Sequence, residues 1–181
     1  MAITGASGAI YGRRCLEVLQ EKGVETHLII SRAAEKVIKQ ELGIDKEDLA
    51  KLATRVYDGD DLGAPIMSGS FKTDGMVIIP CTMKTLAGIV SGYSDSLILR
   101  AADVTLKEGR KLVVVPREAP LSVVHLRNML KVAKLGVTVI PAMPAFYHKP
   151  KRIEDLVDFV VGKVLDYMGI EHQLFKRWTG F

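Results

Sequence analysis

Residues that can bind anions or move protons occur in short clusters from one end of the chain to the other. Most clusters stand where an apolar run gives way to a helical pattern, which marks the sheet edge where amides and helix N-termini meet anionic ligands. We therefore expect one pocket for a phosphorylated ligand, built from the whole chain. The clusters are residues 4–12 (TGASGAIYG), 68–71 (SGSF), 80–85 (PCTMKT), 100–103 with 107–108 (RAAD and KE), 116–120 (PREAP) and 146–147 (FY).

The turn at residues 5–8 has the composition of a ligand-binding loop. Its glycines allow a tight reversal, and its amides and the Ser7 hydroxyl can face a phosphate or a ring at a helix N-terminus. A Walker loop is excluded, because the required Lys-Ser or Lys-Thr ending is absent. A nicotinamide dinucleotide site is the natural rival, but Ser31 and Arg32 stand where an acidic residue would hold the ribose.

Two charged clusters have both a structural and a functional interpretation. Arg100, Asp103 and Lys107 follow one stripe of a predicted helix, so they form either a surface ion-pair ladder or a cationic face on a pocket. Arg117 and Glu118 directly follow an apolar strand, at the end where pockets form in open α/β sheets. A helix-capping role for this second pair is an equally open alternative.

The cysteines and histidines show no pattern of a metal site or a disulfide framework. Cys15 and Cys81 are the only cysteines, which favours a reducing cytoplasm. Cys81 has no clear histidine partner, so we interpret it as a half-buried packing residue. The four histidines are scattered without acidic neighbours at metal spacing, and we expect no protein-held metal.

Strand and helix patterns alternate along the chain and must position these clusters. The clearest helix spans residues 153–168, with apolar positions at i, i+3, i+4 and i+7, and it ends at Gly169. The alternation predicts an α/β three-layer sandwich with a mostly parallel sheet. Strands are predicted at residues 2–4, 27–30, 76–79, 112–115 and 137–140, helices at 33–42 and 46–53, and a long surface loop at 58–70.

Composition narrows the class of protein. The 181 residues, 48% of them hydrophobic, suit a single domain with a substantial core. The net charge of +4 is spread among acidic residues, so a phosphorylated small molecule explains it and no nucleic-acid partner is expected. No apolar run is long enough for a membrane span, and the start is too short for a signal peptide, so a cytoplasmic protein is expected.

The tail, about residues 170–181, carries three aromatic residues that we expect to pack on a neighbouring subunit.

Taken together, the six clusters resemble the UbiX-type flavin prenyltransferases, formerly described as aromatic acid decarboxylases. The resemblance runs from about Ile3 to Trp178 and is nearly residue for residue over 76–92, 100–120 and 141–158. It implies a single-domain, Rossmann-like (flavodoxin-like) flavoprotein that forms a homododecamer with active sites between subunits. Such enzymes join a dimethylallyl group from dimethylallyl monophosphate to N5 and C6 of reduced FMN without a metal. The prenylated FMN then serves UbiD-type decarboxylases.

The resemblance also implies roles for individual residues. Glu41 and Glu118 would be the acid-base carboxylates and, with Ser7 and Lys107, make up the expected catalytic set. The FMN contacts would be Gly5, Ala6, Ser7, Ser31, Thr82, Met83, Lys84, Thr85 and Arg117. The prenyl-phosphate contacts would be Lys107, Arg117, Tyr147 and Lys163, with Trp178 helping to cover the site.

Two departures from the family pattern and two further alternatives stand beside this interpretation. Lys163 occupies a position where relatives often have Arg, so a point charge replaces bidentate phosphate recognition. The first strand is also several residues shorter than is usual in the family. A flavin-dependent cysteine decarboxylase would share the architecture, but its Pro-x-Met-Asn motif is replaced by PAMP at residues 141–144. A non-catalytic flavin-binding subunit is the second alternative.

Overall fold

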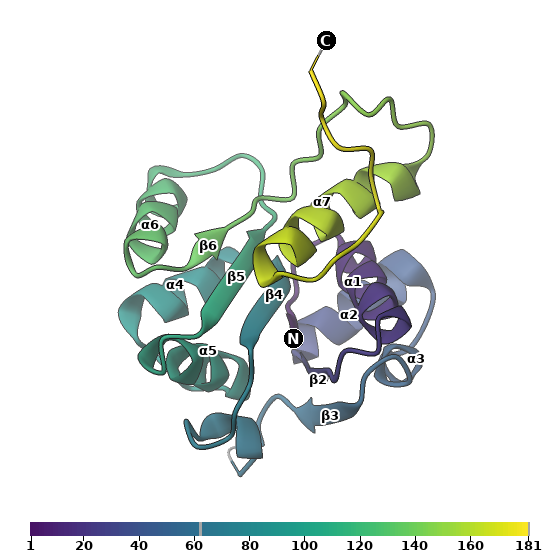
Figure 1. Ribbon diagram of the computed structural model, residues 1–181. Coiled ribbons are helices and arrows are strands. Elements are labelled where there is room, and N and C mark those ends of the chain that lie inside the picture. The colour runs from purple at the N-terminus through teal and green to yellow at the C-terminus, as the bar shows by residue number, and fades with distance from the viewer. Residues whose placement is uncertain (62, 181) are drawn as a thin grey trace.

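A parallel sheet of six strands lies at the centre of the computed structural model, which describes residues 1–61 and 63–180 (Figure 1). The strand order is β3-β2-β1-β4-β5-β6, and every neighbouring pair is parallel. This confirms the predicted Rossmann-like α/β fold in a single domain. The strands are β1 (Ala2–Ile3), β2 (His27–Ile30), β3 (Arg55–Asp58), β4 (Gly75–Cys81), β5 (Lys111–Pro116) and β6 (Thr138–Val139).

Helices cover both faces of the sheet and complete the three predicted layers (Figure 1). One layer holds α1 (Ala9–Glu21), α2 (Arg32–Leu42), α3 (Lys46–Ala50) and α7 (Ile153–Met168). The other holds α4 (Met83–Ser91), α5 (Leu97–Lys107) and α6 (Val123–Lys134). Because every strand except β3 is followed by an α-helix that packs back on the sheet, the carboxyl ends of the strands and the N-termini of these helices share one edge.

The continuous apolar runs of β4 and β5 are explained by burial on both faces. Val113 and Val115 pack with α1 and α7, whereas Leu112 and Val114 pack with α4 and α5, and all four are almost fully buried. Alternate side chains of a strand point to opposite faces, so a strand between two helical layers needs apolar residues at every position.

The structure corrects three of the expected elements. The strand β3 was not predicted, because its exposed positions and mixed composition hide the pairing that its full register with β2 reveals. The helix predicted at residues 46–53 ends at Ala50 and continues as turns. The predicted surface loop at 58–70 contains a 3₁₀ turn (Pro65–Met67), and Ile66 within it is buried against the core. Leu62 of that loop lies outside the described residues.

Gly12 lets α1 pack closely against β4, so a side chain at this position should destabilise the fold. A Cβ there would lie 2.8 Å from the Ile79 carbonyl oxygen and 2.9 Å from the Ile3 side chain. Helix propensity alone would favour alanine by about 1 kcal/mol. We nevertheless expect Gly12→Ala to lower the free energy of unfolding by about 1–3 kcal/mol, because an overpacked core must shift.

Thermal unfolding tests this expectation, with Gly43→Asn as the matched control. Gly43 is the C-cap of α2, no neighbouring heavy atom lies within 4 Å of its would-be Cβ, and its φ of +67° is one that asparagine tolerates. A Gly12→Ala protein that melts at or above the wild-type temperature would contradict the close approach.

Candidate functional site

The carboxyl edge of the sheet gathers most of the predicted FMN contacts. The chain leaves β1 toward β2 on one side while β4 lies on the other, so a topological switch point opens between β1 and β4. Gly5, Ala6 and Ser7 follow β1, Ser31 follows β2, residues 82–85 follow β4 and Arg117 follows β5. We call this group the carboxyl-edge cluster.

Hydrogen bonds tie the ends of these strands together. The Thr4 hydroxyl donates to the Pro80 carbonyl at 2.8 Å and accepts from the Thr82 amide at 2.8 Å. Arg117 Nε donates to the Ser7 carbonyl at 3.1 Å. Thr4 is a buried polar residue that sequence reasoning passed over as part of a strand. Its position next to the glycine turn was the only available signal.

Glu41 reaches from α2 to the start of α1, next to Ser7. Its Oε2 accepts hydrogen bonds from the Gly8 amide at 2.8 Å and the Ala9 amide at 2.9 Å. Partial desolvation would raise the pKa of the Glu41 carboxyl, but hydrogen bonds from the Ser7 hydroxyl and from these amides, together with the Arg117 charge, lower the pKa below its ordinary value. The carboxylate is therefore ionised at neutral pH, and it occupies the helix N-terminus that the sequence suggested for a ligand anion.

The N-termini of α2 and α4 have donor sets that suit the expected FMN phosphate. Ser31 caps α2 by accepting from the Ala34 amide, and Thr82 caps α4 by accepting from the Thr85 amide. The amides of Met83 and Lys84 lie in the first turn of α4, where no intrahelical acceptor exists, and the Lys84 side chain adds a positive charge.

Gly5 holds the glycine turn against α2 at the same edge. A Cβ at Gly5 would lie only 2.5 Å from the Ala33 Cβ, so a side chain would push the turn away from the α2 N-terminus. The residues of the carboxyl-edge cluster thus fit a phosphorylated flavin, with backbone close approach on one side and helix N-termini on the other.

Glu118 and Cys81 also lie at this edge, but Glu118 is exposed whereas Cys81 is buried. The Glu118 carboxylate is exposed beside Arg117, and its Oε1 accepts from the Ala119 amide at 3.2 Å. Ser122, not Glu118, caps α6 by accepting from the His125 amide, so the alternative capping role of the Arg117-Glu118 pair is wrong. Cys81 is completely buried, and burial raises the pKa of its thiol to about 12, which agrees with a packing residue.

Lys107 lies at the opposite edge of the sheet, which corrects the expectation of one pocket within one chain. It ends α5, before β5 begins, whereas Arg117 follows β5. The six residues of β5 span roughly 20 Å at about 3.3 Å each. Arg100 pairs with Asp103 at 2.7 Å, which confirms that part of the ion-pair interpretation, whereas Lys107 Nζ lies 2.7 Å from Oε1 of Glu108, a residue outside the stripe.

The cluster at residues 68–71 also lies at this amino edge. Arg110 holds it through bonds to the Gly69 carbonyl at 2.7 Å and the Phe71 carbonyl at 2.9 Å. A Cβ at Gly69 would collide with the Lys107 and Glu108 side chains, so this loop packs directly on the end of α5.

Tyr147, Trp178 and Lys163 form a third group, on the outer side of α7. The Tyr147 ring lies 5.4 Å from the Trp178 ring and 5.9 Å from the Phe159 ring. Lys163 is half exposed on α7, with Nζ 3.9 Å from Asp166 Oδ2. In Figure 1 the C-terminal tail runs along α7 and rises beside the segment that precedes this helix. We call Tyr147, Lys163 and Trp178 the α7 group.

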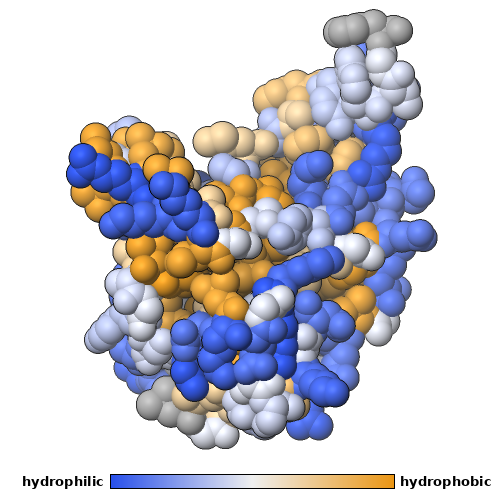
Figure 2. Space-filling view, turned by 60° about the vertical axis from the view of Figure 1, so that its left-hand side comes forward, coloured by the Kyte–Doolittle hydropathy of each residue, from blue (hydrophilic) through white to orange (hydrophobic). Residues whose placement is uncertain are grey.

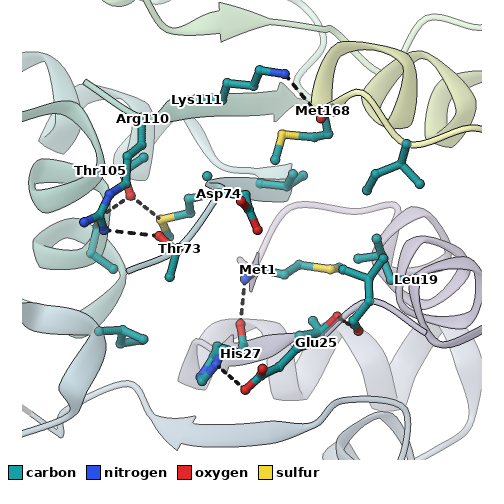
Figure 3. A pocket seen from close by; sticks show the side chains of 18 of the residues that line it. Met1, Leu19, Glu25, His27, Thr73, Asp74, Thr105, Arg110, Lys111 and Met168 are labelled. Carbon is teal, nitrogen blue, oxygen red and sulfur yellow. Dashed lines mark hydrogen bonds and ion pairs between the residues drawn. The ribbon is translucent and has the colours of Figure 1, made fainter. Parts of the chain in front are cut away.

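A cavity of about 580 Å³ opens at the amino edge and contains none of the predicted site residues (Figure 3). It lies beneath Met1, where β1 is shorter than its neighbours. Ala2 pairs with Ile29 and with Ile78, so β2 and β4 continue past the start of β1 and flank a gap one strand wide. Polar groups such as Asp74, shown in Figure 3, stand among its lining residues, but the helix N-termini that suit a phosphate are at the other edge.

Helix α6 carries large apolar side chains that are exposed to solvent in the single chain. Figure 2 shows apolar side chains gathered on the side of the molecule that α6 occupies in Figure 1. Contiguous apolar surface of this kind is typical of interaction sites. The exposed large apolar residues of α6 are Val123, Val124, Leu126 and Leu130, each more than half exposed.

Within residues 1–61 and 63–180, no three His, Cys, Asp or Glu side chains gather as a metal site would require. None of the helices in that same part of the chain combines the length and apolarity needed to cross a bilayer.

Comparison with known proteins gives consistent matches over the full chain. The family model described as Flavoprotein matches residues 1–165. The flavin prenyltransferase UbiX of Methanocaldococcus jannaschii is 54% identical over 178 residues, which are 98% of this chain and 96% of that protein.

Two solved structures agree with this match. A dodecameric FMN-dependent UbiX-like decarboxylase from Escherichia coli O157:H7 has 51% identity and a TM-score of 0.95, over 99% of this chain and all of the other. AnUbiX (PadA1) in complex with FMN and dimethylallyl pyrophosphate has 49% identity and a TM-score of 0.97, over 99% of this chain and 96% of the other. The peptidyl-cysteine decarboxylase EpiD, at 16% identity and a TM-score of 0.62, shares the fold alone.

Proposed function

Because the chain belongs to the Flavoprotein family, among its UbiX-type flavin prenyltransferases, we propose that three groups of its residues meet between subunits around FMN and a dimethylallyl phosphate. The enzyme is an FMN-dependent prenyltransferase. What the proposal adds is the assignment of roles to the carboxyl-edge cluster, to the α7 group and to Lys107.

One observation supports the assignment above all others. Ser7, Glu41 and Arg117 converge at the switch point from three different elements, and a carboxylate with a lowered pKa lies among donors there. Perturbed ionisable groups at the ligand-binding edge of an α/β sheet are typical of a catalytic centre.

The carboxyl-edge cluster would hold FMN. The first turn of α4 and the Ser31 hydroxyl would bind the phosphate, and the glycine turn would let the backbone approach the ring system. When bound and reduced, FMN supplies the nucleophilic N5 and C6 positions that receive the dimethylallyl group. Ser7 and Glu41 would face this part of the site, where Glu41, already ionised, accepts a proton at its carboxylate.

The cationic residues would stabilise the departing phosphate. Breaking an allylic C–O bond places negative charge on the leaving group, and positive side chains at fixed positions lower the free energy of that charge. Arg117, Lys107 and Lys163 would supply the charges, and the Tyr147 hydroxyl would donate a hydrogen bond. Glu118, exposed next to Arg117, would protonate the leaving phosphate.

Assembly would bring the three groups together. Lys107 lies at the edge of the sheet opposite to the carboxyl-edge cluster of its own protomer, so it would complete the site of a neighbouring subunit, which the α7 group would also border. The apolar face of α6 and the exposed Trp178 support this oligomer. The tail packs on α7 of its own chain as far as Arg177, so a contact with a neighbour would involve its end. Phe181 lies outside the described residues. The dodecamer of the E. coli relative supports a homododecamer.

The product and the compartment follow from the same class of enzyme. Prenylated FMN would leave the site and serve a UbiD-type decarboxylase as its cofactor. The two cysteines are both free and buried, which suits the reducing cytoplasm in which we place the enzyme.

Anaerobic incubation with reduced FMN and a dimethylallyl donor tests the proposal. Dimethylallyl monophosphate and dimethylallyl diphosphate are supplied in separate reactions, and the extracted flavin is weighed by mass spectrometry. We expect a mass gain of one prenyl group, faster with the monophosphate. An unmodified flavin with both donors would favour a non-catalytic flavin-binding subunit, and turnover of a peptidyl cysteine instead would favour the decarboxylase alternative.

A further inference from the structure

Two residues of the C-terminal tail bind one carboxylate of α7, that of Asp166. Arg177 donates from Nη1 to Oδ2 and from Nη2 to Oδ1, both at 2.6 Å. His172 Nε2 lies 3.0 Å from Oδ1, and its Nδ1 accepts from the Leu174 amide, so Nε2 carries the proton and donates to Asp166. The carboxylate thus joins two points of the tail to the last turns of α7.

The helix surface beneath this contact is shaped to receive the tail. A Cβ at Gly162 would lie 2.5 Å from the Phe175 ring and 2.6 Å from the His172 ring, so only glycine allows the tail to lie directly on α7. His172 is 5% exposed. The Arg177 guanidinium also lies 5.0 Å from the centre of the Phe175 ring, which orders the side chain that reaches Asp166.

A series of ring contacts connects the tail to the α7 group. Phe175 packs on Phe159 at 4.9 Å, and Phe159 packs on Tyr147 at 5.9 Å. Tyr147 in turn packs on Trp178, the residue that follows Arg177. The position of these rings therefore depends on the anchor at Asp166.

Asp166 also has Lys163 as a neighbour, and Arg177 is the stronger partner. Lys163 Nζ is 3.9 Å from Oδ2, whereas the guanidinium makes two short bonds to the same carboxylate. A bidentate guanidinium pair is stronger and more directional than a pair with an ammonium. The hydrogen bond from Arg177 is also the main reason why the pKa of the Asp166 carboxyl lies below its ordinary value. The carboxylate therefore stays ionised and bound to Arg177.

We propose that Asp166 is a positioning residue whose bidentate bond to Arg177 fixes the tail beside Tyr147 and keeps the Lys163 ammonium available for the phosphate of the prenyl donor. The second half rests on the proposed function of Lys163. When Arg177 is lost, Lys163 turns to Asp166 and one cation leaves the phosphate site.

Tryptophan fluorescence tests the anchor without any substrate, because Trp178 is the only tryptophan in the chain. We expect Arg177→Gln and Asp166→Asn each to make Trp178 more accessible to acrylamide quenching. Arg152→Gln is the matched control, since it removes the same charge from another Arg–Asp pair of α7 and should leave quenching unchanged. Quenching equal to wild type in both anchor variants would overturn the anchor.

Steady-state kinetics test the availability of Lys163. We expect Arg177→Gln to raise the KM for dimethylallyl monophosphate about tenfold, with kcat within about twofold of wild type, as the loss of one charge-assisted hydrogen bond predicts. In a Lys163→Gln background, Arg177→Gln should add no further increase in KM, because the cation that it misdirects is already absent. Fully additive effects would overturn this half of the proposal.

The two measurements separate this inference from the proposed function. A wild-type protein that does not prenylate reduced FMN refutes the proposed function and the role of Lys163 with it. The quenching measurement still decides whether Asp166 fixes the tail.

Discussion

Glu41→Gln is expected to lower kcat for flavin prenylation by about 10²–10⁴-fold, the usual contribution of a positioned acid-base group. The wild-type carboxylate is ionised and lies among the Ser7 hydroxyl and the Gly8 and Ala9 amides. An amide retains a carbonyl oxygen that can accept from the start of α1, but it cannot take up a proton. The loss should therefore appear in the chemical step, with FMN affinity nearly unchanged.

Single-turnover prenylation and FMN titration measure these two quantities on the same preparation. Glu35→Gln is the matched control, because Glu35 is on the same helix and pairs with Lys46 on the surface. Its rate should equal that of wild type. A Glu41→Gln protein that prenylates within threefold of wild type would remove Glu41 from the mechanism.

Lys107→Ala is expected to lower the rate by about 10²–10³-fold, the usual effect of removing one donor that stabilises transition-state charge. Activity should return when this variant is assembled with Glu41→Gln in the same oligomer. Lys107 and Glu41 lie at opposite edges of one sheet, so a working site would take each from a different subunit. Random mixing of two such variants restores about one quarter of the sites in a symmetric assembly.

Co-expression of the two variants with different affinity tags, followed by tandem purification, gives the mixed oligomers. A mixture of Ser7→Ala with Glu41→Gln is the control, because the Ser7 and Glu41 side chains are hydrogen-bonded within one subunit and no intact site can form. If the Lys107→Ala mixture stays as inactive as this control, Lys107 does not act across a subunit boundary.

Local sequence pattern was enough to place several elements within a residue or two. The strands at His27–Ile30 and Lys111–Pro116 and the helix Ile153–Met168 with its Gly169 cap were predicted closely, because burial on both faces or on one stripe imposes a clear periodicity. The exposed edge strand Arg55–Asp58 was missed, since only its pairing with β2 makes it a strand.

Part of the candidate site could likewise be predicted from the sequence, and part could not. The glycine turn, the cluster at residues 80–85 and Arg117 were predicted at one sheet edge, because each directly follows a strand, whereas Ser31 was predicted from the family resemblance. Family resemblance added Glu41, whose contact with the α1 N-terminus spans more than thirty residues of sequence. The single-chain pocket was wrong, because a stripe on a helix does not reveal which end of the sheet it reaches.

The sequence by itself determined the alternation of strands and helices, the chemistry at the strand ends and the family, since all three depend on residue types at short spacing. Only the tertiary structure decided that Lys107 lies at the amino edge, that Asp166 anchors the tail through Arg177, and that Glu41 already fills the helix terminus offered to an anion. These are contacts between residues distant along the chain. Their geometry depends on how the layers pack, which no local pattern encodes.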